Sequence, residues 1–339
     1  MKGLTHSKMI LTYSSISAFK NCRRKYQYSY VDGIELRDRP AYFDFGTAIH
    51  LALASHYRGA GRLQVLEEVE KYFADNAPAQ DESERLQKWI EAREMVTAMY
   101  LNYIQRYPSE SFKVLEIEKP FELPITDVRG DKYKDMMQAG KIDLIAEENG
   151  LWIVEHKSAK TIDTNYKRRL TLDAQSLIYL EAVERLYQKK FNGVIYNVLA
   201  KSVPDKPATL KNGSLSQAKN QNTTPEIYLE AIREGGLDEI NYKEFLEYLE
   251  SNRREYFYRE YLTFTQEDRE EWRRELWQIA ADIERAAELG AYYKNTANCV
   301  GFGTCPYFEI CCAPDKQFVI ENSYVKKQVH SELEKEEAF

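Results

Sequence analysis

The amino-acid sequence predicts an α/β fold with a mixed central sheet, helices flanking the sheet, and helical elaborations around this core. Two β-rich runs, 141–146 and 151–157, lie on either side of a turn with Asn149-Gly150 and predict a hairpin. A helical pattern over 172–189 and an apolar strand at about 193–199 follow. A hairpin followed by a helix and another strand is typical of an α/β core.

Helices are expected throughout the N-terminal part of the chain, residues 1–110. The first begins at Ser14 or Ser15, which are both good N-caps, continues to Val31 and stops at Asp32-Gly33. Three further helical patterns precede Pro108, a residue that ends helices. These patterns span about 45–57, 63–74 and 82–107.

Acidic residues interrupt the strands of the predicted core, 111–200. An alternating strand over about 112–122 precedes the hairpin. Asp143 then stands between two aliphatic residues, and Glu155 follows an apolar triplet. An unpaired carboxylate is expensive to bury. We therefore expect compensating cations or hydrogen bonds at both positions.

Glu155 and Lys157 share one face of their strand, while His156 points away, because strand side chains alternate with period two. The main-chain carbonyl of His156 is then within reach of an ion held beside these side chains. Taken alone, a Glu-x-Lys pair is usually an ion pair on a half-exposed sheet. Asp143, across the tight turn, favours a metal-dependent site instead.

Gln175 and Tyr179 recur at helical i, i+4 spacing and therefore lie on one helix face. For this pair alone, the alternative is an ordinary amphipathic helix with a core tyrosine. Together with two carboxylates and a lysine, the pair matches what a metal-dependent nuclease needs.

These motifs carry a resemblance to a known family. Gly-x-x-Asp ending at Asp143, Glu-x-Lys ending at Lys157 and Gln-x-x-x-Tyr from Gln175 occur in that order. In this the chain resembles the PD-(D/E)XK nucleases of the RecB-like branch, which includes CRISPR-adaptation nucleases, and the resemblance implies a restriction-endonuclease-like core. Family members often carry a further acid on the preceding strand, here Glu116 or, in preference, Glu118.

The N-terminal part extends the resemblance. Phe45-Gly46 followed by His50 matches an aromatic-Gly-x-x-x-His element whose histidine is a metal ligand in the family. A structural histidine at a helix start is the alternative. The run from Tyr13 to Tyr28, with Cys22 followed by basic and aromatic residues, is similar to the opening helix of the family.

The cysteines are a second, independent signal. Of five in the chain, one is near the N-terminus and four lie within 299–312. The sequence shows no signal peptide and the count is odd, so a disulfide framework is not expected. Four thiolates favour an iron–sulfur cluster or zinc, although the spacing is not that of a Cys-x2-Cys zinc ribbon. Free cysteines without a metal are the alternative.

The resemblance assigns these cysteines more specifically. Related nucleases with an iron–sulfur cluster use one N-terminal and three C-terminal cysteines, which implies a 4Fe–4S cluster on Cys22, Cys299, Cys305 and Cys311. Zinc is the alternative metal, and the adjacent Cys312 could replace Cys311. Such a cluster would join the two ends of the chain, where metal binding contributes folding free energy.

Composition agrees with a single nuclease domain over 1–339. No apolar run reaches the roughly 18 residues needed to cross a bilayer, so we expect no membrane contact and a cytoplasmic location. The net charge of −7 does not fit a protein that coats DNA generally. Local positive charge stands at 23–25 and 167–169, and Tyr26, Tyr28 and Tyr30 could stack on bases or pack in the core.

The rest of the chain divides by composition. Residues 201–224 are polar and predict a mobile loop, either a connector or a segment that guides DNA. Residues 225–298 read as a helical elaboration with a β-like stretch at 256–264, and 299–330 hold the cysteines. The acidic tail 331–339 is expected to fray.

The resemblance implies a metal-dependent DNA nuclease, an exonuclease that acts on DNA ends in recombination, repair or phage DNA processing. Asp143 and Glu155, with His50 and the His156 carbonyl, would bind one or two Mg²⁺ or Mn²⁺ ions. Lys157 would position or help deprotonate the attacking water.

Gln175 and Tyr179 would orient Lys157 or the phosphate backbone. The chain contains no Gly-x-x-x-x-Gly-Lys-(Ser/Thr) element, so a helicase or recombination motor would be a separate partner, as would a CRISPR-adaptation protein. A non-catalytic protein that binds DNA ends and a cluster-bearing scaffold are the alternatives from other classes.

Overall fold

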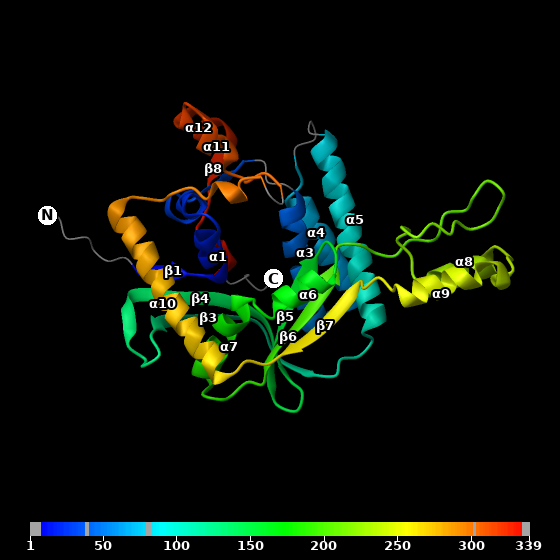
Figure 1. Cartoon of the computed structure of the whole chain (residues 1–339), viewed down its shortest axis with the longest axis horizontal. Helices are drawn as coiled ribbons and strands as arrows, with labels where there is room; N and C mark the ends of the chain where they lie inside the picture. Colours follow the sequence, from blue (N-terminus) through cyan, green and yellow to red (C-terminus); the bar gives the residue numbers. More distant parts are fainter. Residues whose placement is uncertain (1–7, 38–40, 79–82, 301–302, 334–339) are drawn as a thin grey trace.

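The computed structural model describes residues 8–37, 41–78, 83–300 and 303–333. The predicted fold class is confirmed: a mixed central sheet is flanked by helices (Figure 1). Six strands form this sheet, in the order β1-β4-β5-β6-β7 with β3 paired to β4. They are β1 (Met9–Leu11), β3 (Lys113–Thr126), β4 (Lys132–Glu147), β5 (Leu151–Ala159), β6 (Gly193–Ala200) and β7 (Phe257–Leu262).

Strand β4 organises the sheet. β3 runs antiparallel along one of its edges, while β1 and β5 share the other edge. β1 pairs with 136–138 in parallel, and β5 pairs with 144–147 in antiparallel register. Among the described residues, no strand therefore pairs with 139–143 of β4 on that edge.

The predicted hairpin is confirmed between β4 and β5. Asn149 and Gly150 both have positive φ angles, +51° and +131°, which a tight turn of this kind requires. A Cβ added at Gly150 would lie 2.4 Å from the Asn192 side chain, so glycine is also the residue that fits the space. β5 then pairs in parallel with β6, and β6 in antiparallel with β7.

Gly140 has a packing role. A Cβ at this position would lie 2.7 Å from the Phe121 ring, closer than real Cβ atoms approach, and 3.1 Å from the Tyr179 ring, which is a tight contact. The missing side chain lets helix α7 (Ala174–Tyr187) approach β4 at the point where the strand has a free edge. This is the physical reason for glycine in the Gly-x-x-Asp motif.

Two hydrophobic cores cover the two faces of the sheet. Tyr196 and Val198 of β6 belong to the core built with α1, α7 and α10, whereas Ile195 and Leu199 face the other side. That opposite side is covered by α3, α4 and α5 (Figure 1). The helices are α1 (Tyr13–Asn21), α3 (Ala41–Tyr57), α4 (Arg62–Asp75), α5 (Ser83–Arg106) and α10 (Gln266–Leu289).

The first predicted helix, 14–31, is wrong as a continuous element. α1 is capped by Thr12 in a capping box with Ser15, and it ends where Cys22 adopts extended backbone, with φ −163° and ψ 114°. A short helix α2 (Arg23–Tyr26) and a π-helix η1 (Gln27–Val31) follow. The Asn295 N–H donates to Cys22 Sγ at 3.3 Å, a long-range contact that accompanies the break.

Two strands of the sheet depart from the predicted organisation. β1 lies in the segment before the first helix, where no element was expected. β7 falls within the β-like stretch predicted at 256–264, and it belongs to the central sheet although the surrounding segment 225–298 was expected to be a helical elaboration. The helical part of that segment comprises α8 (Pro225–Glu234), the 3-10 helix η2 (Glu239–Tyr242) and α9 (Lys243–Ser251), with α10 after β7.

Residues 201–224 form a long connection whose regular structure is an isolated bridge between Thr209 and Leu215. Leu215 is buried against Tyr228 and Phe245 of the α8–α9 unit. In Figure 1 this connection and the α8–α9 unit extend away from the sheet. The predicted mobility of the connection stays a prediction.

The C-terminal segment returns to the N-terminal one. β2 (Ile34–Leu36) pairs in antiparallel with β8 (Tyr324–Lys326), beside α11 (Phe308–Cys312) and α12 (Lys316–Ser323) (Figure 1). Short 3-10 helices are η3 (Thr296–Asn298) and η4 (Ser331–Leu333). Most of the tail predicted to fray, from residue 334 onward, lies outside the described residues. None of the described helices is both long and apolar enough to span a membrane.

Candidate active site

Asp143 is held at the point where β4 and β5 stop pairing. The last pair of the ladder joins Leu144 to Val154, so the His156 N–H has no partner on β4. That N–H donates to Asp143 Oδ2 at 2.7 Å instead. Nδ1 of His50, on α3, lies 3.3 Å from Asp143 Oδ1. The buried carboxylate is thus compensated by the sheet on one oxygen and by a helix on the other.

Glu155 is 3% exposed, and its two carboxylate oxygens differ in their hydrogen-bond partners. Oε1 accepts from Lys157 Nζ at 3.0 Å and from Gln175 Nε2 at 2.8 Å. Oε2 is buried and has no hydrogen-bond partner among the described residues. Burying a carboxylate oxygen without a hydrogen-bond partner costs free energy, because the oxygen loses its water. A ligand that binds Oε2 would offset this cost.

Gln175 connects the other members of the motif. Its amide oxygen accepts from Lys157 Nζ, and its Nε2 also donates to the Tyr179 hydroxyl at 2.8 Å. Helix α7 begins one residue before Gln175, where the Asp173 side chain caps the helix by accepting from the Gln175 N–H. The cap fixes the first turn, and with it the place from which Gln175 reaches β5.

Opposite influences act on the two carboxyl groups. Burial, followed by the charge of Asp143, raises the pKa of Glu155. Burial alone would raise the pKa of Asp143 as well, but the neighbouring His50 outweighs it and lowers that pKa. Two carboxylates that disfavour each other's charge in a buried site provide the electrostatic conditions for a cation.

The two cationic side chains are held in their charged forms. Burial alone would lower the pKa of His50, but the Asp143 carboxylate outweighs it and raises the pKa to about 9. Burial would also lower the pKa of Lys157, and the Glu155 and Asp173 carboxylates instead raise it above its ordinary value. Metal ligation by His50 would therefore require loss of its proton.

The residues fit Mg²⁺ or Mn²⁺ in donor chemistry. Mg²⁺ is usually bound by one or two carboxylates, with waters and substrate phosphates completing the shell. Asp143 and Glu155 supply two carboxylates, and Glu155 Oε2 is the partnerless oxygen. No group of three or more His, Cys, Asp or Glu side chains within the described ranges is arranged to hold a metal ion. His50 would therefore join the two carboxylates only after a rearrangement, and water, main chain and phosphate would supply the remaining ligands.

Glu118 is the acid of strand β3 that faces this site. It stands opposite Asp143, between the pairs Ile117–Leu144 and Lys119–Ile142, with φ at +52°. Burial, then the Asp143 charge, raises the pKa of Glu118, and Lys141 forms an ion pair with it. Glu116 instead accepts from Tyr187 and pairs with Lys119.

Sequence reasoning missed Tyr13. Its ring centroid lies 5.7 Å from Lys157 Nζ. Burial, followed by the charge of Asp173, raises the pKa of its hydroxyl, so Tyr13 stays protonated beside the lysine. The only signal in the sequence was its position at the start of a helix, which does not indicate a contact with Lys157 on β5.

A buried polar network behind the site was also missed. The His156 ring stacks on Tyr57, with centroids 5.6 Å apart and planes at 10°, and its Nδ1 lies 2.9 Å from Asn197 Nδ2. Asn197 Oδ1 accepts from Arg259 Nε at 3.1 Å. Arg259 forms a two-pronged ion pair with Glu110, at 2.5 and 2.8 Å. The network joins α3 and the α5–β3 connection to β5, β6 and β7.

The cysteines assigned to a cluster come from the break after α1 and from the segment before and within α11. The Cys305 N–H donates to the Cys299 carbonyl at 2.8 Å. Burial, with smaller contributions from the thiols of Cys22 and Cys299, raises the pKa of Cys305. Burial raises the pKa of Cys311 too, with contributions from Cys305 and Cys22. Four thiols are thus electrostatic neighbours, although within the described ranges they are not arranged as a finished metal site.

Cys312 differs from these four. Its side chain is exposed, whereas those of the other four cysteines are half-buried. The Lys294 ammonium donates to the Cys311 carbonyl at 2.7 Å, which ties this part of α11 to the segment before Cys299. Of the two adjacent cysteines, Cys311 is therefore the one on the side of the other thiols.

Comparison with the sequence profiles of known protein families gives a match that spans most of the chain. The sequence profile of the PD-(D/E)XK nuclease superfamily matches residues 10–312. A search of curated proteins gave no match. The chain is similar to the crystal structure of SSO0001, at 11% identity over 92% of this chain and 89% of that one, with a TM-score of 0.33.

A second solved structure is that of a protein from Eubacterium rectale provisionally named an exonuclease. It shares 14% identity over 79% of this chain and 93% of that one, with a TM-score of 0.33. Structural similarity at this TM-score does not support a conclusion about function. The profile match, in contrast, spans most of the chain and includes every motif residue of the site. The chain belongs to the PD-(D/E)XK nuclease superfamily.

Proposed function

We propose that this protein is a metal-dependent deoxyribonuclease that hydrolyses phosphodiester bonds from DNA ends. One observation carries the proposal: Lys157 and Gln175 both bind Glu155 Oε1, while Glu155 Oε2 is buried without a partner among the described residues. The lysine and one carboxylate oxygen are thus fixed, and the other oxygen remains available to a cation beside Asp143.

Asp143 and Glu155, with the His156 carbonyl and a deprotonated His50, would hold one or two Mg²⁺ or Mn²⁺ ions. A bound divalent cation neutralises charge on the scissile phosphate and lowers the pKa of an attacking water. The protein contributes a buried site in which such charges interact strongly. Glu118 on β3 is a further carboxyl group of this region, and Lys141 forms an ion pair with it.

Lys157 has the role of positioning the attacking water and stabilising negative charge on the phosphate. In its pairing with Glu155 the lysine stays an ammonium, because the carboxylate raises its pKa. An ammonium can donate to a water or to a phosphate oxygen, and it cannot accept a proton. Gln175 holds the Lys157 ammonium from the helix side, and Tyr179 holds Gln175. Both act as positioning residues.

A 4Fe–4S cluster on Cys22, Cys299, Cys305 and Cys311 belongs to the same proposal. Support comes from donor chemistry: the thiols of Cys22 and Cys299 both affect the pKa of Cys305, those of Cys22 and Cys305 affect the pKa of Cys311, and a set of thiolates is what such a cluster requires. These cysteines come from the break after α1 and from the segment before and within α11. A cluster there would stabilise the junction between the two ends of the chain. Zinc is the alternative occupant.

DNA is the proposed substrate, and a helicase or recombination protein is the proposed partner where unwinding is needed. A cleavage assay tests the proposal and also shows the polarity of digestion and the preference for single or double strands. End-labelled linear single strands, linear duplex and covalently closed circular DNA are incubated with anaerobically purified protein and Mg²⁺ or Mn²⁺. The proposal expects stepwise shortening of a linear substrate that EDTA abolishes.

Closed circular DNA distinguishes the two kinds of nuclease. An exonuclease leaves the circle intact because it has no end, and nicking of the circle would instead show an endonuclease. Binding of linear DNA without any metal-dependent cleavage would contradict the enzyme and favour a non-catalytic protein that recognises DNA ends.

A further inference from the structure

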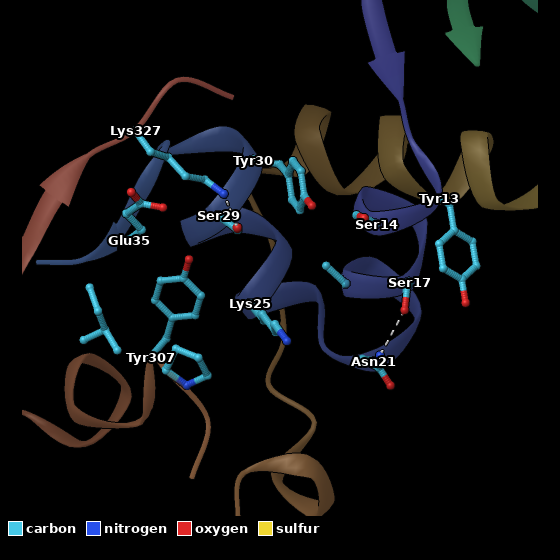
Figure 2. A pocket seen from close by; sticks show the side chains of 13 residues that line it. Tyr13, Ser14, Ser17, Asn21, Lys25, Ser29, Tyr30, Glu35, Tyr307 and Lys327 are labelled. Carbon is cyan, nitrogen blue, oxygen red and sulfur yellow. Dashed lines mark hydrogen bonds between the residues drawn. The ribbon is translucent and has the colours of Figure 1, made fainter. Parts of the chain in front are cut away.

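A cavity of about 370 Å³ lies between α1, the α2–η1 segment and β2 (Figure 2). Figure 2 shows that its lining residues bond one another: Lys327 donates to Ser29, and Asn21 donates to Ser17. Among the described residues that line this cavity, none belongs to the three motifs of the site. A buried network on the face of the sheet that α3 and α5 cover, in contrast, bonds directly to the β5 motif.

This network contains a row of polar side chains that crosses three strands. His156 of β5 is in register with Asn197 of β6, and Asn197 is in register with Arg259 of β7. Residues in register on neighbouring strands present their side chains on the same face of a sheet. Contacts with Tyr57 of α3 and Tyr103 of α5 place the row under these helices.

The hydrogen bonds of the row fix the orientation of the Asn197 amide. Its oxygen accepts from Arg259 Nε at 3.1 Å, so its Nδ2 faces the other way. Nδ2 donates to His156 Nδ1 and to the Tyr103 hydroxyl, both at 2.9 Å. His156 Nε2 is buried and has no hydrogen-bond partner in the described part of the chain. Asn197 therefore makes the hydrogen bond that holds the His156 ring.

Arg259 is itself fixed at its far end. Its guanidinium pairs with Glu110 through two bonds, at 2.5 and 2.8 Å, and both side chains are largely buried. It also donates to the Tyr103 hydroxyl at 3.0 Å. A guanidinium that binds a carboxylate with two parallel bonds has a defined plane, so Arg259 offers Asn197 a donor in a fixed direction.

The row ends at the residue whose main chain holds Asp143. The His156 N–H donates to Asp143 Oδ2 at 2.7 Å, beyond the last pair of the β4–β5 ladder. The His156 ring stacks on Tyr57, with centroids 5.6 Å apart. Asn197 and Tyr57 thus hold the ring from two sides. Through the ring they orient the main-chain N–H and carbonyl of His156 beside the carboxylates.

The same network positions the second group that holds Asp143. The Tyr57 hydroxyl lies 2.5 Å from the Tyr103 hydroxyl and donates to Glu110 at 2.7 Å. Tyr57 is the last residue of α3, about two helical turns after His50. These bonds anchor α3 where His50 Nδ1 lies 3.3 Å from Asp143 Oδ1. One buried network therefore fixes the partners of both Asp143 oxygens.

We propose that Asn197 and Arg259 are positioning residues for the catalytic cation: through His156 and Tyr57 they hold Asp143 in the geometry that binds it. The proposal rests on the proposed function as a metal-dependent nuclease, and it adds residues that act on the cation without touching it. Hydrogen-bonding partners of this kind behind a metal site change metal affinity by about tenfold to a hundredfold.

The test measures Mn²⁺ binding in the absence of DNA. Full-length, anaerobically purified protein is titrated with Mn²⁺ at one pH, and free Mn²⁺ is followed by its EPR signal. The binding that Glu155→Gln removes defines the site. Asn197→Ala should weaken this binding by about tenfold or more. The variant changes no charge, so a change in direct attraction of the cation does not account for the loss.

A double-mutant cycle shows whether Asn197 acts through His156. His156→Phe keeps a ring that can stack on Tyr57 and keeps the main-chain N–H, but it removes Nδ1. Asn197→Ala added to His156→Phe should therefore cost little further Mn²⁺ affinity, because the bond that couples the two residues is already lost.

Tyr57→Phe tests the branch that runs through α3. It keeps the ring that stacks on His156 and removes the hydroxyl that bonds Tyr103 and Glu110. Mn²⁺ binding should weaken about tenfold, and this variant provides a test even if Asn197→Ala does not fold.

Tyr228→Phe is the control for loss of a hydrogen bond elsewhere. It removes the hydroxyl of a buried α8 tyrosine that donates to the Ser216 carbonyl, in the unit that extends away from the sheet in Figure 1. Melting temperatures are measured for all variants. Tyr228→Phe should leave Mn²⁺ affinity unchanged.

The outcomes distinguish the network from the function. Unchanged Mn²⁺ affinity in Asn197→Ala and Tyr57→Phe would overturn the proposal, as would an equal loss in Tyr228→Phe or full additivity in the double variant. In the cleavage assay, Asn197→Ala should raise the Mn²⁺ concentration needed for half-maximal rate, and saturating Mn²⁺ should restore most of kcat.

Two further results concern the proposed function itself. A wild-type protein that binds Mn²⁺ through Glu155, loses affinity in Asn197→Ala and cleaves no DNA would overturn the nuclease function and leave the positioning role standing. A wild-type protein whose Mn²⁺ binding is unchanged by Glu155→Gln would contradict both.

Discussion

Gln175 donates its side-chain amide to Glu155 Oε1 at 2.8 Å, which joins helix α7 to strand β5 at the candidate catalytic centre. The bond fixes the side chain of Glu155 from the face of the sheet that α7 covers. As a result, the carboxylate presents its other oxygen, Oε2, without a partner among the described residues. The helix therefore determines which oxygen of Glu155 is available to a cation.

Gln175→Ala should lower kcat by about tenfold to a hundredfold, because Lys157 and Glu155 lose the group that holds both of them and misplacement of catalytic groups costs rate. The variant should also lose about 1–3 kcal/mol of stability, because Gln175 is buried and bonds Lys157, Glu155 and Tyr179. The measurement is cleavage rate at saturating DNA. Gln87→Ala, at an exposed glutamine of α5 whose side-chain amide donates to Glu91, is the matched control. An effect no larger than that of the control would contradict the positioning role.

Arg259→Met should destabilise the protein by about 3–5 kcal/mol, because it leaves the largely buried Glu110 carboxylate without its partner. The measurement is the free energy of unfolding in urea. Arg253→Met removes an arginine from exposed pairs with Glu250 and Glu226 and should cost at most about 1 kcal/mol. Similar losses in the two variants would show that the Glu110–Arg259 pair is not buried in solution.

Lowering the pH should reduce the free energy of unfolding, because Glu110 becomes protonated. Burial alone would raise the pKa of Glu110, but hydrogen bonds from Arg259 and Tyr57 outweigh it and hold the pKa below its ordinary value of 4.5. A lowered pKa means that the stabilisation is fully present above about pH 4.5 and is lost as the pH falls toward the folded-state value.

Glu110→Gln provides the measurement for this pH dependence. The difference in unfolding free energy between wild type and the variant should be largest near neutral pH and should shrink below pH 4.5. Both proteins keep the same cysteines, so any acid loss of a bound metal affects them alike. A difference that stays constant from pH 7 to pH 4 would refute the assignment.

Cys311→Ser should abolish iron binding by the anaerobically purified protein, whereas Cys312→Ser should retain it. The reason is that Cys311 lies among the thiols of Cys22 and Cys305, while the adjacent Cys312 is exposed. Iron, sulfide and zinc analysis of the two variants is the measurement. Equal iron content in both would rule out this ligand set.

Much of the candidate site could be predicted because its geometry is local. Alternation along a strand places Glu155 and Lys157 on one face, and the i, i+4 rule pairs Gln175 with Tyr179. A short turn with positive φ at Asn149 brings β4 and β5 together. Each of these relations joins residues that are close together in the chain, so local sequence patterns are sufficient to predict it.

The relations that could not be predicted are long-range. The helix break at Cys22 accompanies a contact with Asn295, 273 residues away in the chain. Arg259 meets Glu110 across 149 residues, and either charge alone reads as a surface residue. β1 is three residues long, too short for a strand pattern, and it exists because β4 has a free edge.

The most direct test of the account compares two carboxylates in one cleavage assay. End-labelled linear DNA is incubated with Mg²⁺ or Mn²⁺ and with wild type, Glu155→Gln or Glu116→Gln, the last being a β3 carboxylate held by Tyr187 and Lys119. The account predicts that cleavage requires the metal, is lost by at least about a hundredfold in Glu155→Gln, and persists in Glu116→Gln. Cleavage that survives Glu155→Gln, in a protein free of contaminating nuclease, would contradict it.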